Sequence, residues 1–327
     1  MRRTEPNAIL AINSTDRYTI GKLASPIAAP LFKFYSAPVI PGQRGGTPAN
    51  DFVLQYPNAL IYGYIKSLVI SQIQINYHIP TIVPNVNDKL PLKYSIDGFN
   101  FILVLIQLPY GFYTPKELAA MLQYVIRQQT PLVDLTVEYI NSAQIEFGYG
   151  LGNGFLIQTN TTDEIKFPFA NDADLLANVT TRQLNGVLRT YRLLGVVPSS
   201  DGQVLTETNS PNFLYTDYID ICSASLTKYQ KMKDSDTSAT KRNNILARIY
   251  LSGNGNPQPT SPDYALGSQP FVLTADLNSP KVVRWSQDEA IYDLDFQLYD
   301  SYSEPLYWSY LYPTEFSATL LCVESED

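Results

Sequence analysis

The chain has 327 residues, of which 45% are hydrophobic and only 17% are charged, against about 25% charged residues in an ordinary soluble domain. The formal charge of −8 argues against a protein that binds nucleic acid through its net charge. The length allows roughly two domains. With 24 tyrosines and few charges, the surface suits contact with partner proteins, although strands of any β protein also favour tyrosine.

Residues 1–50 show no sustained periodicity and are interrupted by proline and glycine from Ser25-Pro26 to Gly45-Gly46. We expect an extended arm that lies along another surface, and whose deletion leaves the β domain folded. Six basic residues against two acidic ones give the arm a net charge of +4, whereas residues 285–327 carry ten acids and no lysine or arginine. The two ends could meet between neighbouring subunits, or the acidic end could be a solvated tail.

Residues 52–108 have a β pattern. Polar and apolar side chains alternate over residues 70–77, with one slip near Ser71. Asp97-Gly98 is a turn signal, and the almost continuous apolar run over residues 101–106 predicts a strand that is covered on both faces.

The clearest helix of the chain follows, over residues 115–130. Thr114 and Glu117 form a capping box, and Pro115 occupies the first helical position, where no amide donor is lost. Apolar residues at i, i+3, i+4, i+7 and i+8 from Leu118 form one stripe, and the helix ends before Pro131. Strands are predicted over residues 135–147 and 155–161, so the helix can bury its stripe on a small sheet.

The β pattern then resumes, with strands predicted over residues 213–226, 245–251, 271–277, 281–285, 292–299 and 316–323. Strands in two blocks with long returns favour a mainly β fold, a single jelly-roll β-sandwich with an inserted α+β cassette. The predicted organisation is an arm (1–50), a jelly-roll domain (51–107 and 196–327) and the inserted cassette (108–195).

The side chains that could carry chemistry are few. His78 is the only histidine, so a histidine-based metal cluster is excluded and a catalytic triad would need this residue. Asp293 and Asp295 share one face of a strand, as paired catalytic carboxylates could, but alternation alone places them on a solvent face. Asp217 and Asp220 likewise lie in a strand and its approach. We therefore expect no enzyme, and no catalytic, cofactor-binding or metal-binding residues.

Other signals have ordinary explanations. The run Gly148–Gly154 superficially suggests a phosphate loop, but it joins two strands, and Asn153-Gly154 predicts a hairpin. Cys222 and Cys322 lie in apolar runs and are expected to be buried thiols without a disulfide or metal. No apolar run is long enough for a membrane span, and no signal peptide is expected behind Arg2-Arg3.

The order of several motifs resembles one viral family. The segment LPYGFYTPKELAAMLQYVI, then TVEYINSAQIEFGY, FLIQTNT and YRLLGV, resembles an insertion in penton and minor capsid proteins of virophages and related tailless icosahedral double-stranded DNA viruses. The pattern there is roughly a P-x-G-x-Y-T-x-x-E-L helix, two strands and a closing L-L-G turn. DLDFQLYDSYSEPLYW, with its D-x-x-x-x-P-L step, resembles the last jelly-roll hairpin of those proteins. Residues 167–192 are longer here and partly helical in pattern.

The resemblance implies a structural virion protein, a penton that forms the five-fold vertices of an icosahedral capsid as a homopentamer. It implies the major capsid protein and other capsid proteins as partners, with no specific nucleic acid, no cofactor and no membrane span. Location in the virion follows, after synthesis in the host cell cytoplasm. The alternatives are a minor capsid or cement protein beneath or beside the vertex, and a surface glycan-binding β-sandwich.

Overall fold

The computed structural model describes residues 8–16, 21–22, 51–55, 65–140, 154–159, 163–196, 211–229, 244–251, 266–276, 281–285, 290–291, 293–307 and 314–324. The chain divides into two compact units. The first unit comprises Met1–Ile79, Thr216–Asn256 and Pro270–Asp327, and the second comprises Pro80–Tyr215 and Pro257–Gln269. Both units are therefore assembled from segments that are distant in the sequence.

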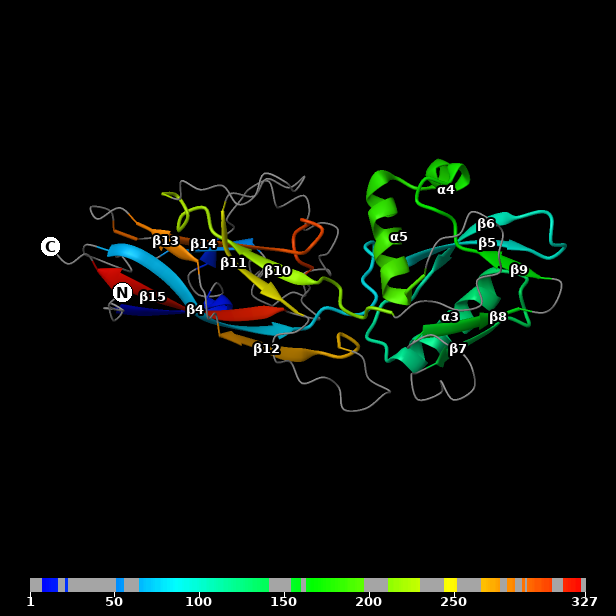
Figure 1. Cartoon of the computed structure of the whole chain (residues 1–327), viewed down its shortest axis with the longest axis horizontal. Helices are drawn as coiled ribbons and strands as arrows, with labels where there is room; N and C mark the ends of the chain where they lie inside the picture. The colour runs from blue at the N-terminus through cyan, green and yellow to red at the C-terminus, as the bar shows by residue number, and fades with distance from the viewer. Residues whose placement is uncertain are drawn as a thin grey trace, which may run out of the picture. The chain divides into compact units, whose positions relative to one another are not determined.

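The first unit holds two five-stranded antiparallel sheets (Figure 1). One sheet has the order β1-β15-β4-β12, with β13 also paired to β4, and the other has the order β11-β10-β14-β3-β2. The first sheet contains β1 (Ala8–Asn13), β4 (Ile65–Tyr77), β12 (Phe271–Asp276), β13 (Val282–Arg284) and β15 (Glu315–Glu324). The second contains β2 (Gly21–Lys22), β3 (Asp51–Gln55), β10 (Tyr218–Cys222), β11 (Ile245–Tyr250) and β14 (Asp293–Tyr299). A short 3-10 helix, η1 (Ser14–Asp16), follows β1.

The two sheets share one apolar core. Phe296 of β14 and Phe316 of β15 are buried and pack edge to face, with ring centroids 5.8 Å apart. Side chains at alternate positions of β14 and β15 are buried in this core, as expected for strands with one buried face. The mainly β, jelly-roll-like sandwich predicted from the sequence is thus confirmed.

The slip in the alternation of β4 has a structural cause. Thr319 of β15 pairs with Gln72, and the next residue, Leu320, pairs with Ile70, so that Ser71 is an extra residue. Its hydroxyl donates a hydrogen bond to the carbonyl of Thr319 at 3.3 Å. This β-bulge keeps Ile70 and Ile73 on the buried face, although they are three residues apart.

The second unit combines a three-stranded sheet of order β6-β5-β9 with the pair β7-β8 and helices α3, α4 and α5 (Figure 1). The strands are β5 (Lys89–Ser95), β6 (Ile102–Gln107), β7 (Thr136–Ile140), β8 (Gly154–Gln158) and β9 (Glu164–Lys166). The helices are α3 (Pro115–Gln129), α4 (Ala173–Asn178) and α5 (Thr181–Leu194). One buried cluster joins them, with contributions from Leu92, Ile106, Leu122, Phe155 and Tyr191.

Helix α3 forms as its sequence predicts. The Thr114 side chain accepts from the backbone N–H of Glu117, and the Glu117 carboxylate accepts from the N–H of Thr114 at 2.9 Å. The predicted stripe is buried at Leu118, Leu122, Val125 and Ile126, so the helix packs its apolar face into the unit's core.

The second unit extends beyond the expected cassette boundaries at 108 and 195. The second unit begins at Pro80 because β5 and β6 pair with each other and with β9, whereas neither pairs with a sandwich strand. At its other end the unit continues to Tyr215. Strand β7 is described as far as Ile140, and residues 141–153, which hold the rest of the predicted strand and the predicted hairpin turn, lie outside the described residues.

The described part of residues 1–50, for which an extended arm was expected, pairs with strands of the sandwich. Strand β1 pairs with β15 along its whole length, and β2 pairs with β3. Ile12 is buried in the sandwich, because β15 offers an edge along which this short apolar segment completes the sheet. The proline-rich stretch over residues 23–50 lies outside the described residues.

Candidate functional site

The histidine that sequence analysis singled out occupies an ordinary strand end. His78 follows β4, is half-buried, and its backbone N–H donates to the Thr314 hydroxyl at 3.4 Å. Within the described residues, no group of three or more histidine, cysteine or acidic side chains is placed to hold a metal ion. The prediction that the protein is not an enzyme stays a prediction.

The carboxylate of Asp295 holds a turn. It accepts hydrogen bonds from the Ser223 hydroxyl at 2.9 Å and from the backbone N–H groups of Ala224 and Ser225 at 2.8 Å each, and also from the Ser225 hydroxyl. These bonds fasten the chain after β10 onto β14. A carboxylate with this many donors is used as an anchor, and the side chain of Asp293, its predicted companion, lies outside the described residues.

A second carboxylate lies beside it on the same sheet face. Asp51 of β3 is 7% exposed and accepts a long hydrogen bond from the Gln297 amide, at 3.5 Å. Burial raises the pKa of Asp51 to about 6, against the lowering effect of the Gln297 hydrogen bond, and the charge of Asp295 raises it further. No local sequence pattern indicated this pair, because it depends on β3 lying next to β14.

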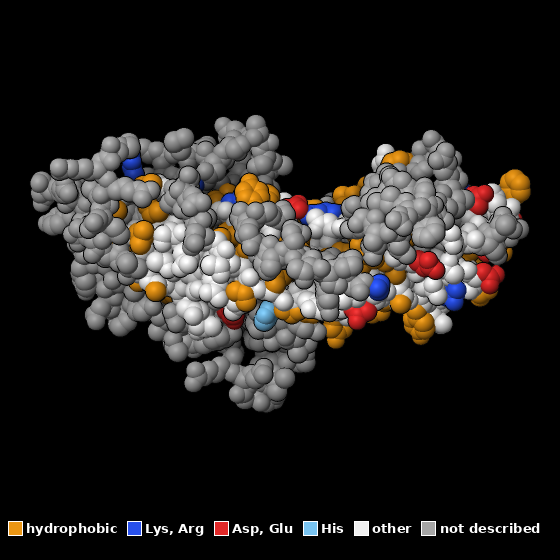
Figure 2. Space-filling view, turned by 60° about the horizontal axis from the view of Figure 1, so that its bottom comes forward, with side chains coloured by type: hydrophobic (Ala, Val, Ile, Leu, Met, Phe, Trp, Pro, Cys, Tyr) orange, Lys and Arg blue, Asp and Glu red, His pale blue; other side chains and the backbone are white. Residues whose placement is uncertain are grey.

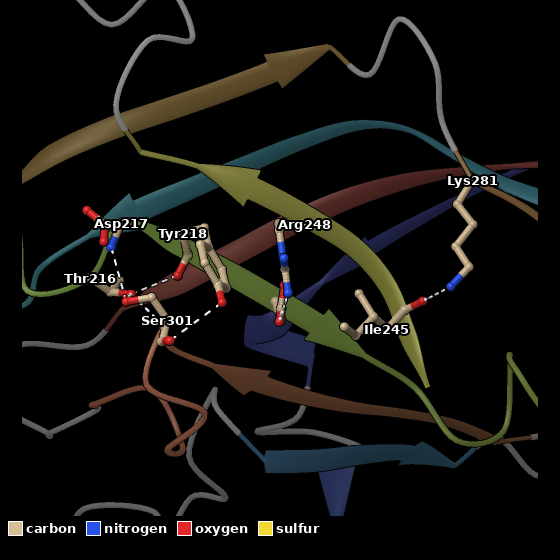
Figure 3. Close-up of polar contacts among 8 residues, drawn as sticks. Thr216, Asp217, Tyr218, Ile245, Arg248, Lys281 and Ser301 are labelled. Carbon is tan, nitrogen blue, oxygen red and sulfur yellow. Dashed lines mark hydrogen bonds and ion pairs between the residues drawn. The ribbon is translucent and has the colours of Figure 1, made fainter. Parts of the chain in front are cut away.

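The edge of the second sheet carries an ion pair next to two tyrosines, and Figure 3 shows Arg248 and Tyr218 of this group. Arg248 of β11 donates from Nε and Nη2 to the two carboxylate oxygens of Asp220 on β10, at 2.7 and 2.9 Å. The guanidinium lies over the ring of Tyr218, 4.0 Å from its centroid, and Tyr218 packs edge to face with Tyr250 at 5.8 Å. Asp220 is 4% exposed and Tyr250 is 50% exposed, so the pair is part of a half-open aromatic edge.

The turn that contains the D-x-x-x-x-P-L step fixes the start of β10. The Asp300 carboxylate accepts from the N–H groups of Tyr302 and Glu304, both at 2.9 Å. The neighbouring Ser301 donates its N–H to the Thr216 hydroxyl at 2.7 Å, a contact visible in Figure 3. Asp217, the remaining acidic candidate, accepts through its backbone carbonyl from the N–H of Leu251 at 2.9 Å. The motif that resembles a capsid hairpin is therefore a compact turn.

The most distinctive surface of the first unit is the outer face of the sheet formed by β1, β15, β4 and β12. Register places Asn13, Ser317, Gln74 and Thr274 in one row across the four strands. A second row contains Ala11, Thr319 and Gln72. We call these seven residues the neutral face.

The seven residues of the neutral face are uncharged, and acidic residues border them at Asp276, which pairs with Gln72, and at Glu315, which pairs with Asn76. Most of the seven are accessible: Ala11, Asn13, Gln72, Gln74 and Thr274 are exposed, and Ser317 and Thr319 are half-buried. Figure 2 turns the lower side of Figure 1 towards the viewer, and the part of the chain that contains β4 and β12 shows a broad white area with few red or blue side chains.

This composition suits contact with protein. Charged groups lose strongly favourable hydration when an interface covers them, whereas amides and hydroxyls need only a matching donor or acceptor. The alternation of Gln72 and Gln74 with buried isoleucines was visible in the sequence and marked one solvent face. That Thr274 and Ser317 extend the same surface depends on strand order, which no local pattern contains.

The two cysteines lie in the core, as their apolar sequence surroundings predicted. Cys222 and Cys322 are both buried, and burial raises the pKa of the Cys322 thiol to about 11. In the part of the chain that is described, no helix combines the length and apolarity needed to cross a membrane.

Comparison with known proteins gives a structural likeness without a sequence match. No family model and no curated protein matches the chain. Among solved structures, the selenomethionine-labelled mavirus penton protein aligns with 98% of this chain and 100% of its own, at 9% sequence identity and a TM-score of 0.47. A likeness of this degree assigns neither a family nor a function.

Proposed function

We propose that this chain is a structural protein of a virion, a penton that assembles as a homopentamer at the five-fold vertices of an icosahedral capsid. The observation that carries the proposal is the neutral face on a jelly-roll-like sandwich. A capsid subunit must bury broad surfaces against copies of itself, and each copy here has a net charge of −8. A face whose central residues are uncharged reduces like-charge repulsion where copies meet.

The sequence resemblance supports the same proposal independently. The helix signature around Thr114, the closing turn after Tyr191 and the D-x-x-x-x-P-L turn occur in the order typical of penton and minor capsid proteins. The partners would be the major capsid protein and other capsid proteins, and the location would be the virion. A minor capsid or cement protein beneath or beside the vertex has the same requirements, and differs in copy number and position.

A specific observation favours a second candidate, a glycan-binding β-sandwich on the virion surface. Tyr218, Tyr250 and Arg248 form a half-open edge with an aromatic ring and a hydrogen-bonding guanidinium. Aromatic faces and planar polar groups are suitable for sugar rings. A glycan array with the parent chain and a Tyr250→Ala variant tests this candidate, which requires binding that the substitution abolishes.

Light scattering of the purified chain tests the penton proposal. The expected mass is about five times 36.7 kDa at high protein concentration. Gln74→Lys and Thr274→Lys should abolish the pentamer with little change in melting temperature, because they place charge on an exposed position of the neutral face. Gln128→Lys, at an exposed position of α3, is the matched control and should leave the pentamer intact. A monomer at every concentration that is also absent from virion vertices would reject the proposal.

A further inference from the structure

Strand β6 is an edge of the second unit's three-stranded sheet. A helix side chain closes one end of this edge. The N–H of Gln107 donates to the Gln129 side-chain oxygen at 2.9 Å, and the Gln129 amide donates to the carbonyl of Gln107 at 3.1 Å. The amide of Gln129 thus takes the place of a neighbouring strand at this residue.

The contact at Gln107 also determines which way the other backbone groups of β6 point. Residues of an antiparallel strand direct their N–H and C=O groups alternately towards one neighbour and the other. Leu108 donates to Asp88 of the β5 side, and β5 and β6 pair without a register shift, so Leu103 and Leu105 point away from β5 as Gln107 does. Among the described residues, neither Leu103 nor Leu105 has a partner for these outward groups.

The edge also lacks the usual protection against strand addition. Natural edge strands are guarded by charged side chains, proline or bulges. Residues 102–107 contain no charge and no proline. Ile102 is 56% exposed, and Leu103 and Leu105 are half-buried. The opposite edge of the same sheet, β9, is short and carries Glu164 and Lys166.

We propose that β6 pairs antiparallel with β6 of a second copy, around a two-fold axis at Val104. This register places Leu103 opposite Leu105 of the partner subunit, and Leu105 opposite the partner subunit's Leu103. Both residues direct their free N–H and C=O groups outward, so each opposed pair exchanges two hydrogen bonds. The backbone groups of Gln107 already bond to the Gln129 side chain, so Gln107 takes no part in the new ladder.

The composition of β6 favours a second copy of the same strand as its partner. An uncharged apolar segment pairs with an identical one without like-charge repulsion, and the two-fold arrangement uses every outward group that the structure leaves open. A two-fold contact is isologous, whereas the contacts of a five-fold ring are heterologous. The inference therefore goes beyond the proposed penton function, and either can fail without the other.

Proline at position 105 tests the pairing directly. Leu105→Pro removes one outward N–H and leaves the bonds to β5 intact, a position that edge strands tolerate. Leu105→Thr keeps the N–H and is the control for the lost side chain. In sedimentation of the full chain, we expect the two-fold association to be lost in Leu105→Pro and retained in Leu105→Thr, with similar melting temperatures. Association that survives Leu105→Pro unchanged assigns it to another surface and overturns the proposal.

A cross-link keeps the proposal testable if the proline variant misfolds. The register brings Val104 opposite the same residue of the partner at a non-hydrogen-bonded position, where Cα atoms lie about 4.5 Å apart, within reach of a disulfide. Val104→Cys should form a covalent dimer under mild oxidation. The two native cysteines are buried and should not compete for the cross-link. Tyr124→Cys, at an exposed position of α3, is the control for random collision. Equal cross-linking at both positions, or none at Val104→Cys, contradicts the two-fold register.

Discussion

Gly186 of α5 lies against the backbone of Val86, so closely that an added Cβ would be 2.1 Å from the Val86 carbonyl oxygen. The same contact is supported by Thr190, whose hydroxyl lies 3.0 Å from the carbonyl of Asn87. Helix α5 is therefore docked on the loop before β5 through backbone, at a position where only glycine fits.

We expect Gly186→Ala to destabilise the second unit. Overpacking of a core typically costs about 1–3 kcal/mol, and here it outweighs the gain of about 1 kcal/mol in helix propensity. Asn185→Ala, at the exposed neighbouring position, should be neutral or slightly stabilising. Thermal unfolding compares the two, and a Gly186→Ala variant as stable as Asn185→Ala would show that the helix can shift away from Val86 without cost.

The two units should lose structure separately. Leu122 is 1% exposed in the core of the second unit, and Leu122→Asp would bury a carboxylate with no cationic partner, at a cost of several kcal/mol. Hydrogen exchange should then report lost protection in α3, β5 and β6, with β4 and β15 still protected. Gln128→Asp, exposed on the same helix, is the control. Simultaneous loss of protection in both units would mean that they fold as one.

Helix α3 was predictable because its signals are local: the capping box at Thr114 and Glu117, and a stripe at helical spacing, lie within one segment. Strand β5 was not predicted, since Pro91 interrupts its pattern. Proline is tolerated there because Leu105, its partner on β6, directs its own backbone groups away from β5, and pairing with β9 begins only at Lys93.

Strand β1 was missed for a similar reason. Its six residues gain their structure from β15, which is about 300 residues away in the sequence, and proline-rich neighbours obscure the pattern. The candidate surface was half visible. The alternation of polar and apolar residues identified Gln72 and Gln74 as solvent-facing, but only the strand order β1-β15-β4-β12 assembles the neutral face.

Removal of residues 1–16 should lower the melting temperature of the isolated chain. The deletion exposes the edge of β15, removes buried Ile12, and removes Ser14, whose hydroxyl donates to Glu315 at 2.5 Å and accepts from the N–H of Phe316 at 2.9 Å. Burial of an isoleucine alone contributes about 1.5–3 kcal/mol. Deletion of residues 1–7 is the control. Equal melting temperatures for both truncations would restore the interpretation of this segment as an arm.

The stability of the sandwich should depend on the protonation of Asp51. Because its pKa is raised from 3.8 to about 6, the native state binds this proton more tightly than the unfolded state does. The contribution of Asp51 to the free energy of unfolding therefore falls as the pH rises from about 4 to about 6, and the native state remains penalised above that range. Asp51→Asn should raise stability at pH 7 and flatten this part of the pH profile, as measured by urea unfolding. Asp134→Asn, an exposed carboxylate, serves as control, and identical profiles for the parent and Asp51→Asn would show that Asp51 is solvated.

The two partners of the edge ion pair should not be equivalent. Arg248→Met leaves the Asp220 carboxylate, whose side chain is 6% exposed, without its cation, whereas Asp220→Asn leaves a guanidinium whose side chain is 37% exposed and can be hydrated. Loss of one partner of a fully buried pair costs about 3–5 kcal/mol, and partial exposure of Arg248 reduces this. We expect Arg248→Met to be more destabilising than Asp220→Asn in urea unfolding at pH 7, and the double variant to recover part of the loss, because it removes the stranded charge. Equal effects of the two single substitutions, or a double variant as unstable as the sum of both, would contradict an asymmetric burial of the pair.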